Sequence, residues 1–316
     1  KGFVSGTFDW YREDRTDVLL PGGQRAIPPY FGATAPIANL GQVENRGYEV
    51  ELKFNHTFGN GMNVWWTTNF THSKNKIITA DDPELYPAYQ KREGYAVNQA
   101  HSYVSQGYYN TWDELYASTI HSTNDAAKLP GNYNILDYNA DGIIDAKDNV
   151  PYGYTGTPQN TYNNTVGFNW KGLSAFVQFY GVNNVTRQVV LTSLGSQNHV
   201  VYDQGSYWSK DDTGADLPMP RWLATASDFN NGSRFMYDGS YLRLKNAEVA
   251  YTFDGKTNWI KSAGLQSIRF YLNGNNLFLW SKMPDDREAN YAGTGWASQG
   301  AYPTVKRFNL GANIIF

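Results

Sequence analysis

Apolar and polar residues alternate at every second position along much of this chain. In the clearest segment, residues 48–55, the apolar side chains are Tyr48, Val50, Leu52 and Phe54, and the residues between them are Glu49, Glu51, Lys53 and Asn55. A β-strand places such alternate residues on one face, whereas a helix would scatter them around its circumference. Seven further segments show the same period of two: residues 4–10, 62–71, 166–170, 173–180, 241–253, 268–273 and 308–316. We therefore predict an all-β, antiparallel fold with eight strands.

Two segments depart from simple alternation. Within residues 241–253 the apolar positions change phase, from Leu242 and Leu244 to Ala247 and Val249. One extra residue near 245–246 would produce this change, so we predict a β-bulge there. Residues 113–118 favour a single turn of helix within a loop.

The connections between the predicted strands alternate between short and long. Residues 59–61 and 171–172 form tight turns and residues 254–265 a moderate connection, whereas segments 13–46, 74–160, 183–240 and 281–304 are long. Loops of such length are uncommon inside a compact soluble domain. Outer-membrane barrels have short periplasmic turns, long extracellular loops, an apolar outer face and a polar inner face. The pattern predicts a transmembrane antiparallel β-barrel with long extracellular loops; a soluble β-sandwich is the alternative.

Composition narrows the class of protein further. The 316 residues include no cysteine, which excludes a disulfide scaffold and a thiolate site. Basic residues number 26 against 29 acidic ones, so no positive charge excess points to nucleic acid. The mean hydropathy of -0.56 and the lack of a long apolar run exclude a helical membrane protein. Because the sequence opens within a strand-like alternation and without a signal peptide, we expect a piece of a longer protein.

Five blocks of sequence resemble one family. They are NLGQVENRGYEVELKF (39–54), REGYAVNQAHSYVSQGYY (92–109), LPGNYNILDYNADGIIDAKDNVPYG (129–153), SYLRLKNAEVAYTF (240–253) and IRFYLNGNNLFLW (268–280) running on to Phe316. In this order and spacing they are similar to the C-terminal part of SusC-like, or RagA-like, TonB-dependent outer-membrane transporters. The resemblance implies that residues 1–316 form the last eight strands of a 22-stranded barrel, without the plug domain.

The family resemblance also implies a function. It predicts an outer-membrane importer of oligosaccharides or oligopeptides, energised by TonB and working with a SusD-like surface lipoprotein, in contact with outer-membrane lipid. It predicts no enzymatic activity. A passive porin or a surface adhesin on a small β-barrel is the alternative function, and a secreted carbohydrate-binding sandwich is a third.

Residues 137–148 have the spacing of a calcium-binding loop. Oxygen-bearing side chains stand at positions 1, 3, 5, 9 and 12 of the segment, and a glycine stands at position 6. The predicted ligands are Asp137, Asn139, Asp141, Ile143 (through its carbonyl), Asp145 and Asp148. Asp148 replaces the usual glutamate, and its shorter side chain would weaken affinity. We expect a structural Ca²⁺ here; a loop of Asx turns without an ion is the alternative.

Aromatic residues are frequent in the long loops. They include Tyr103, Tyr108, Tyr109, Trp112, Tyr207, Trp208, Trp222, Trp296 and Tyr302. Aromatic rings stack on sugars, and tyrosine hydroxyls bond to glycan or peptide groups. We therefore consider Tyr108, Tyr109, Trp112 and Trp208 as candidate cargo contacts. The alternative is that these rings pack the loops against one another or against a partner protein.

A carboxylate pair on one strand is the only arrangement that points to catalysis. Glu49 and Glu51 lie on the same strand face, at a separation that a retaining glycosidase could use. Lys53 continues that face, however, and charged side chains are ordinary in a barrel lumen. We therefore predict no catalytic residue.

Overall fold

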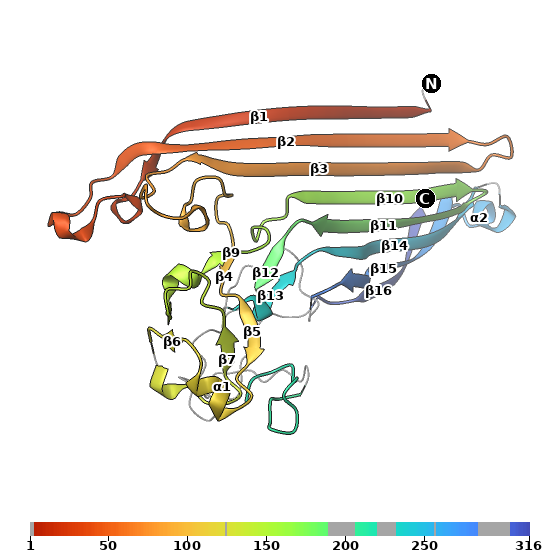
Figure 1. The fold of residues 1–316 in the computed structure, drawn as a ribbon. Helices are drawn as coiled ribbons and strands as arrows, with labels where there is room; N and C mark the ends of the chain where they lie inside the picture. Colours follow the sequence, from red (N-terminus) through yellow and green to blue (C-terminus); the bar gives the residue numbers. More distant parts are fainter. Residues whose placement is uncertain (1–2, 124, 189–205, 220–231, 256, 284–303) are drawn as a thin grey trace.

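The central feature of the fold is a single eight-stranded antiparallel sheet. The computed structural model describes residues 3–123, 125–188, 206–219, 232–255, 257–283 and 304–316. The strands of the sheet are, in spatial order, β1 (Val4–Leu20), β2 (Ala38–Thr57), β3 (Asn63–Thr79), β10 (Asn160–Trp170), β11 (Leu173–Asn183), β14 (Tyr241–Asp254), β15 (Ser267–Ser281) and β16 (Arg307–Ile315). The sheet twists, so that β15 and β16 run obliquely to β1–β3 (Figure 1). The eight predicted strands are confirmed.

Cross-strand pairing gives the sheet one apolar and one polar face. One row of direct partners runs through all eight strands as Val4, Phe54, Trp66, Val166, Val177, Ala247, Gly274 and Phe308. The residues next to these in sequence, one from each strand, form a second row of direct partners: Ser5, Lys53, Thr67, Thr165, Gln178, Asn246, Asn275 and Arg307. Neighbouring positions point to opposite faces of a strand, so these rows belong to opposite faces. We call them the apolar row and the polar row.

The predicted β-bulge is present in β14. The register shifts between Leu244 and Asn246 against β15, and between Gln178 and Phe179 against β11. The insertion of Lys245 keeps Leu244 on the same face as Ala247, because one extra residue restores the phase of the alternation.

The first long connection is shorter than the sequence pattern predicts. Strand β1 continues to Leu20 and β2 begins at Ala38, so much of segment 13–46 is paired strand. Residues 12–17 and 44–46 are polar or charged on both faces, and the period of two is therefore invisible in this part of the sequence. An ion pair between Arg12 and Glu44, 2.9 Å long, supports this part of the pairing. As a result β1–β3 extend beyond the neighbouring strands (Figure 1).

Aromatic rings cover glycines on neighbouring strands of the sheet. Trp65 lies over its cross-strand partner Gly167, where a Cβ atom would also stand 2.9 Å from the Ala175 carbonyl oxygen. Tyr162 covers Gly181 in the same manner. Glycine weakens a strand because it offers no side chain for packing, and a ring laid across it from the next strand compensates.

The long loops contain short elements of their own. These are β4 (His101–Ser102), β5 (Ser105–Tyr108), α1 (Trp112–Tyr116), β6 (Ile120–His121), β7 (Tyr133–Ile135), β8 (Ile143–Ile144), β9 (Val150–Pro151), β12 (Thr186–Gln188) and β13 (Met236–Asp238), with 3-10 turns at Gly22–Gln24, Pro29–Phe31, Ala88–Gln90, Asp125–Ala127, Ala146–Asp148 and Ser233–Phe235. Helix α2 (Asn258–Ser262) lies in the moderate connection between β14 and β15. Helix α1 confirms the predicted helical turn. Among the described helices none is long and apolar enough to cross a membrane.

The main hydrophobic core lies in the loops. It joins two loop segments that are distant in sequence, and its buried members are Tyr108, Tyr133, Ile135, Ile144, Trp208, Ala215, Leu217 and Phe235. The Tyr108 hydroxyl donates to the Asp216 carbonyl (3.1 Å), and the Trp208 indole donates to Asn110 (3.0 Å). Residues 103–123, 125–144, 206–219 and 232–237 therefore contribute to one packed unit, which we call the loop core.

A buried polar cluster borders the loop core. His121 is 6% exposed, and its ring nitrogen lies 3.4 Å from the Tyr109 hydroxyl. The Lys128 ammonium forms a 2.7 Å ion pair with Asp125 and lies 5.7 Å from the centre of the Tyr109 ring. Burial, and secondarily the charge of Lys128, lowers the pKa of His121 from its ordinary 6.5 to about 4, although Asp125 opposes this shift.

This cluster predicts that the loop core loses stability in acid. Because the pKa of His121 is lower in the folded than in the unfolded protein, the unfolded state takes up a proton first. Stability should therefore fall as pH decreases from about 6.5 to about 4, by up to about 3 kcal/mol. Hydrogen exchange of residues 101–151 between pH 7 and pH 4.5 measures this loss. His121→Gln should remove much of the pH dependence, whereas exposed His101→Gln should keep it; equal profiles for both variants would contradict the assignment.

Candidate functional site

The polar face of the sheet carries side-chain hydrogen bonds that cross from strand to strand. Gln178 donates to Asn163 (3.0 Å), Asn246 donates to Gln178, and Asn275 donates to Asn246. These four amides connect β10, β11, β14 and β15 in one chain. Asn163 only accepts in this series, the other three amides each use one donor, and all four keep further donor or acceptor capacity. The face can therefore offer hydrogen bonds to a hydrated ligand.

A second series of polar side-chain contacts runs beside the first. Arg269 pairs with Glu248, Asn273 donates to Glu248 (3.4 Å), and Asn309 donates to Asn273 (2.7 Å). It extends the polar face through β14 and β15 to β16. The sequence signals this face only as polar alternation, because the partners are set by the register between strands.

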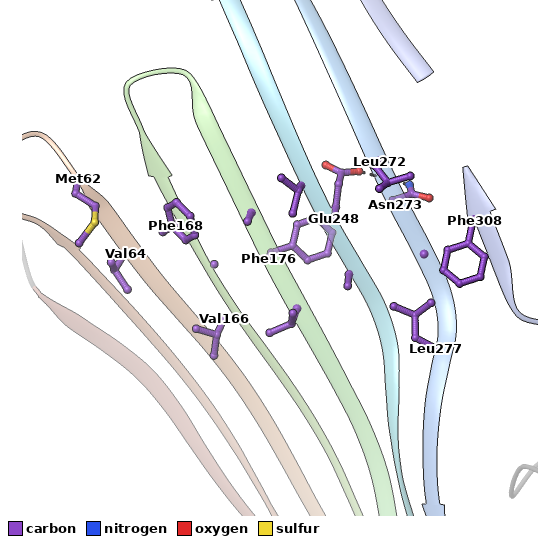
Figure 2. A pocket seen from close by; sticks show the side chains of 16 residues that line it. Met62, Val64, Val166, Phe168, Phe176, Glu248, Leu272, Asn273, Leu277 and Phe308 are labelled. Atoms are coloured by element: carbon purple, nitrogen blue, oxygen red, sulfur yellow. Dashed lines mark hydrogen bonds between the residues drawn. The ribbon is translucent and has the colours of Figure 1, made fainter. Parts of the chain in front are cut away.

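The opposite face contains an apolar groove of about 530 Å³. Its lining comes from β3, β10, β11, β14, β15 and β16, together with Met62 in the turn before β3 (Figure 2). The groove exists because Ala175, Ala247 and Gly274 have small side chains or none. Larger side chains, such as those of Phe168, Leu272 and Phe308, border it. This surface has the character of a lipid contact.

The four candidate cargo aromatics occupy two kinds of position. Tyr108, Tyr109 and Trp208 are 6%, 1% and 7% exposed, and they pack within and beside the loop core. This is the alternative arrangement considered for loop aromatics. Trp112 is 51% exposed on α1, and its ring stacks on Tyr116 with centroids 5.9 Å apart. Trp222, Trp296 and Tyr302 lie outside the described residues.

The short helix α1 holds Trp112 at its first position. Thr111 caps the helix by accepting a hydrogen bond from the Glu114 amide (3.1 Å), and the Glu114 carboxylate accepts one from the Asn110 amide (2.6 Å). Such reciprocal bonds fix the start of a helix. Leu115 is buried, whereas Trp112 and Tyr116 are exposed. The two rings therefore form a fixed, accessible aromatic pair.

Glu49 and Glu51 lie on the polar face, as the alternation predicts. Glu51 forms an ion pair with Lys53, the next residue along that face. The arrangement is that of a polar lumen wall.

The predicted calcium loop is closed by its own hydrogen bonds. Buried Asp148 accepts from the amides of Tyr138 (2.8 Å), Asn139 (3.3 Å) and Asp145 (2.8 Å). Asp141 accepts from the Ile143 amide (3.0 Å), and Gly142 takes the left-handed backbone that the loop's tight turn requires.

Lys147 supplies a cation to this loop. Its ammonium lies 3.1 Å from Asp141 and 3.5 Å from Asp145. The hydrogen bond from Lys147 lowers the pKa of Asp141. One Asp137 oxygen, Oδ1, is buried without a hydrogen-bond partner, while its Oδ2 accepts from Gly142 (2.9 Å). In the described part of the chain, no three acidic, His or Cys side chains converge as a ready metal site. The orphaned oxygen and the oxygen-rich donor set fit a calcium ion only if the Lys147 ammonium moves away.

Two features of the molecule are absent from the sequence-based predictions. The His121–Lys128 cluster gives no recognisable spacing, because its members meet only when the loop folds. The side-by-side placement of Arg12, Arg46 and Lys74 on β1–β3 depends on register. Long, charged continuations of the strands are the only sequence signal for it.

Comparison with known proteins gives two curated relatives, whereas no family model matches the chain. TonB-dependent receptor P3 of Formosa agariphila is 30% identical over 341 residues, covering 98% of this chain and 32% of the relative. TonB-dependent receptor P26 of the same organism is 24% identical, covering 100% of this chain and 33% of the relative. The chain spans about a third of the length of these relatives.

Solved structures share the fold. The RagAB peptide transporter matches with a TM-score of 0.68 at 18% identity, and the RagAB peptide importer in its open-open state with 0.64 at 19%. Each match covers 99% of this chain and 33% of the other. These proteins are receptors and transporters, not enzymes. Along nearly its whole length, this chain is therefore similar to the TonB-dependent receptors P3 and P26, of which it covers about a third.

Proposed function

We propose that the complete protein carrying this chain is an outer-membrane nutrient importer. It is energised by TonB, works with a SusD-like surface lipoprotein, and takes up oligosaccharides or oligopeptides. The observation that carries the proposal is the similarity to TonB-dependent receptor P3 over 98% of the chain. The two-faced sheet supports it, because an apolar row toward lipid and a polar row toward a lumen are what a barrel wall requires.

In this proposal the polar face of the sheet and the long loops have different roles in cargo binding. The amide chains on the polar face offer hydrogen bonds along the path of a hydrated cargo. The loop core holds extracellular segments in place, and Trp112 with Tyr116 provides an apolar platform beside them. Peptide backbones and sugars both present hydroxyl or amide groups to such surfaces, so both cargo classes stay in the proposal.

Energy dependence separates an importer from the alternatives. Cells that express the complete protein should accumulate labelled oligosaccharides or oligopeptides, and a protonophore should abolish this accumulation. Cells lacking the gene are the control. Uptake that persists with the protonophore would indicate a passive porin, and surface binding without uptake would indicate an adhesin. Either result would overturn the importer proposal.

Trp112 is the candidate cargo contact that the structure leaves accessible. Trp112→Ala should weaken cargo binding about fivefold to tenfold, because a stacked aromatic ring contributes about 1 kcal/mol or more. Binding of labelled cargo to intact cells measures the change. Tyr30, 90% exposed in another loop, provides the control Tyr30→Ala. Equal binding by the two variants would contradict a cargo role, provided that both reach the surface in equal amounts.

We also propose that residues 137–148 bind a structural Ca²⁺. The buried, unpartnered Oδ1 atom of Asp137 favours it. Asp137, Asn139, Asp141, Asp145, Asp148 and the Ile143 carbonyl would hold the ion. Lys147 is the competing cation in the loop.

Lys147→Ala distinguishes a calcium loop from a loop closed by lysine alone. With the ammonium removed, Ca²⁺ should bind more tightly, and protease resistance of the loop should rise with added Ca²⁺ and fall with a chelator. Limited proteolysis and metal content of the complete protein measure both effects. Asp137→Asn should abolish the calcium response, whereas Asp113→Asn on α1 should not. A loop that is equally sensitive with Ca²⁺ and chelator in all variants would sink the proposal.

A further inference from the structure

Three basic side chains form a row across the first three strands. Arg12 on β1, Arg46 on β2 and Lys74 on β3 are direct cross-strand partners, and all three are exposed. We call them the cationic row. Each stands eight positions along its strand from the apolar row, an even offset, and no register shift intervenes. The cationic row therefore lies on the apolar face of the sheet, where charged side chains are unexpected.

An aromatic row lies directly beneath the cationic row. Two residues nearer the apolar row, the partners are Trp10, Tyr48 and His72. The Tyr48 ring stacks 5.8 Å from Phe70 and lies 5.1 Å from His72. Aromatic residues gather where the outer surface of a barrel leaves the hydrocarbon layer. This position agrees with strand length, since the segment from Tyr48 to the end of β2 at Thr57 has the roughly 10 residues that cross a bilayer.

Carboxylates hold the arginines of the cationic row in place. Glu44, whose side chain is only 13% exposed, lies 2.9 Å from Arg12 and 2.6 Å from Arg46. Asp14 also pairs with Arg12 at 2.9 Å. A guanidinium has five N–H donors, so these pairs leave donors on both arginines for a further acceptor. Glu44 thus fixes the direction of two side chains that would otherwise be mobile.

The net charge of this surface is positive. Lys76 lies beside Glu44 in the next row outward, so four cations and two carboxylates occupy these two rows. Among the described residues, no side-chain ion pair involves Lys74 or Lys76. An anion with several oxygens, placed over the row, would meet both arginine forks and the Lys74 ammonium.

We propose that the cationic row binds the phosphorylated headgroup of an outer-leaflet lipid. Arginine suits phosphate because its planar fork donates two parallel hydrogen bonds. The acyl chains of the lipid lie against the apolar face below, beginning at the aromatic row. Amphiphilic complementarity selects this occupant: a phosphate and a hydrocarbon tail are needed at adjacent heights, and the surface offers a cationic row and an aromatic row in that order. The inference rests on the outer-membrane placement proposed above.

The experiment uses the complete natural protein purified in detergent. Native mass spectrometry would measure binding of a diphosphorylated lipid A and of the same lipid after removal of its phosphates. The wild type should prefer the phosphorylated form, and rising salt should reduce that preference. In the row variant, Arg12, Arg46 and Lys74 are replaced by alanine. It should bind the phosphorylated lipid at least about tenfold more weakly, because it loses all the charged donors that the row offers to the phosphate.

A control variant removes the same charge elsewhere. It replaces three cations off the row, Arg15, Lys53 and Lys171, by alanine. It should bind the phosphorylated lipid as the wild type does. The variant Arg12→Lys with Arg46→Lys keeps the charge but loses the forks, and it should fall between the row variant and the wild type. Fractionation into the outer membrane tests the placement separately, so failure of that placement is distinguishable from failure of lipid binding.

Three results would overturn the proposal. Equal binding of the phosphorylated and dephosphorylated lipids by the wild type would remove the role of phosphate. If the row and control variants lost the same amount of lipid binding, the binding would depend on overall positive charge and not on the cationic row. Unchanged lipid binding by the row variant, together with lost co-purification of a partner lipoprotein, would assign the row to a protein contact instead.

Discussion

The structure depends on one constraint: side chains alternate between the two faces of the sheet, and this alternation is kept in register through all eight strands. Because successive residues point to opposite faces, a slip of one residue in any strand would place its apolar set among the polar side chains. Eight strands keep one row apolar from Val4 to Phe308 and the adjacent row polar from Ser5 to Arg307. The bulge at Lys245 belongs to this constraint, since it corrects the one strand whose sequence changes phase.

The same constraint explains where the protein core lies. A wall with one face toward lipid and one toward a lumen has no second layer to pack against, and its apolar side chains stay exposed: Phe308 is 72% and Leu310 83% exposed. The loops must therefore build their own core, and they use Tyr108 and Trp208 to do so. An aromatic residue in these loops is first a packing residue. Trp112 differs because α1 buries Leu115 and leaves its other face exposed.

The sequence predicts the structure correctly where an element is determined by periodic patterns and by neighbouring residues. The alternation at residues 48–55, the phase change after Leu244 and the helical turn near Trp112 all depend on neighbours in the chain. The extension of β1 and β2 was missed because Arg12 and Glu44 interrupt the apolar alternation there. Burial of Trp208 could not be predicted, since its indole bonds to Asn110, 98 residues away. The calcium spacing identified a real polar turn, but spacing does not reveal that Asp148 accepts three amides or that Lys147 lies against Asp141.

The two edge strands of the sheet determine where further pairing is possible. Strands β1 and β16 stand at opposite ends of the strand order, and within the described residues they are not paired with each other. An eight-stranded closed barrel would require that pairing, and the described residues do not show it. An open edge leaves backbone donors and acceptors without partners, which hydrocarbon does not tolerate. If the sheet lies in a membrane, as proposed, each edge needs a pairing partner. Because the cationic row begins on β1, any partner that pairs with this edge would border the proposed lipid site, and its charge would affect how a headgroup is held.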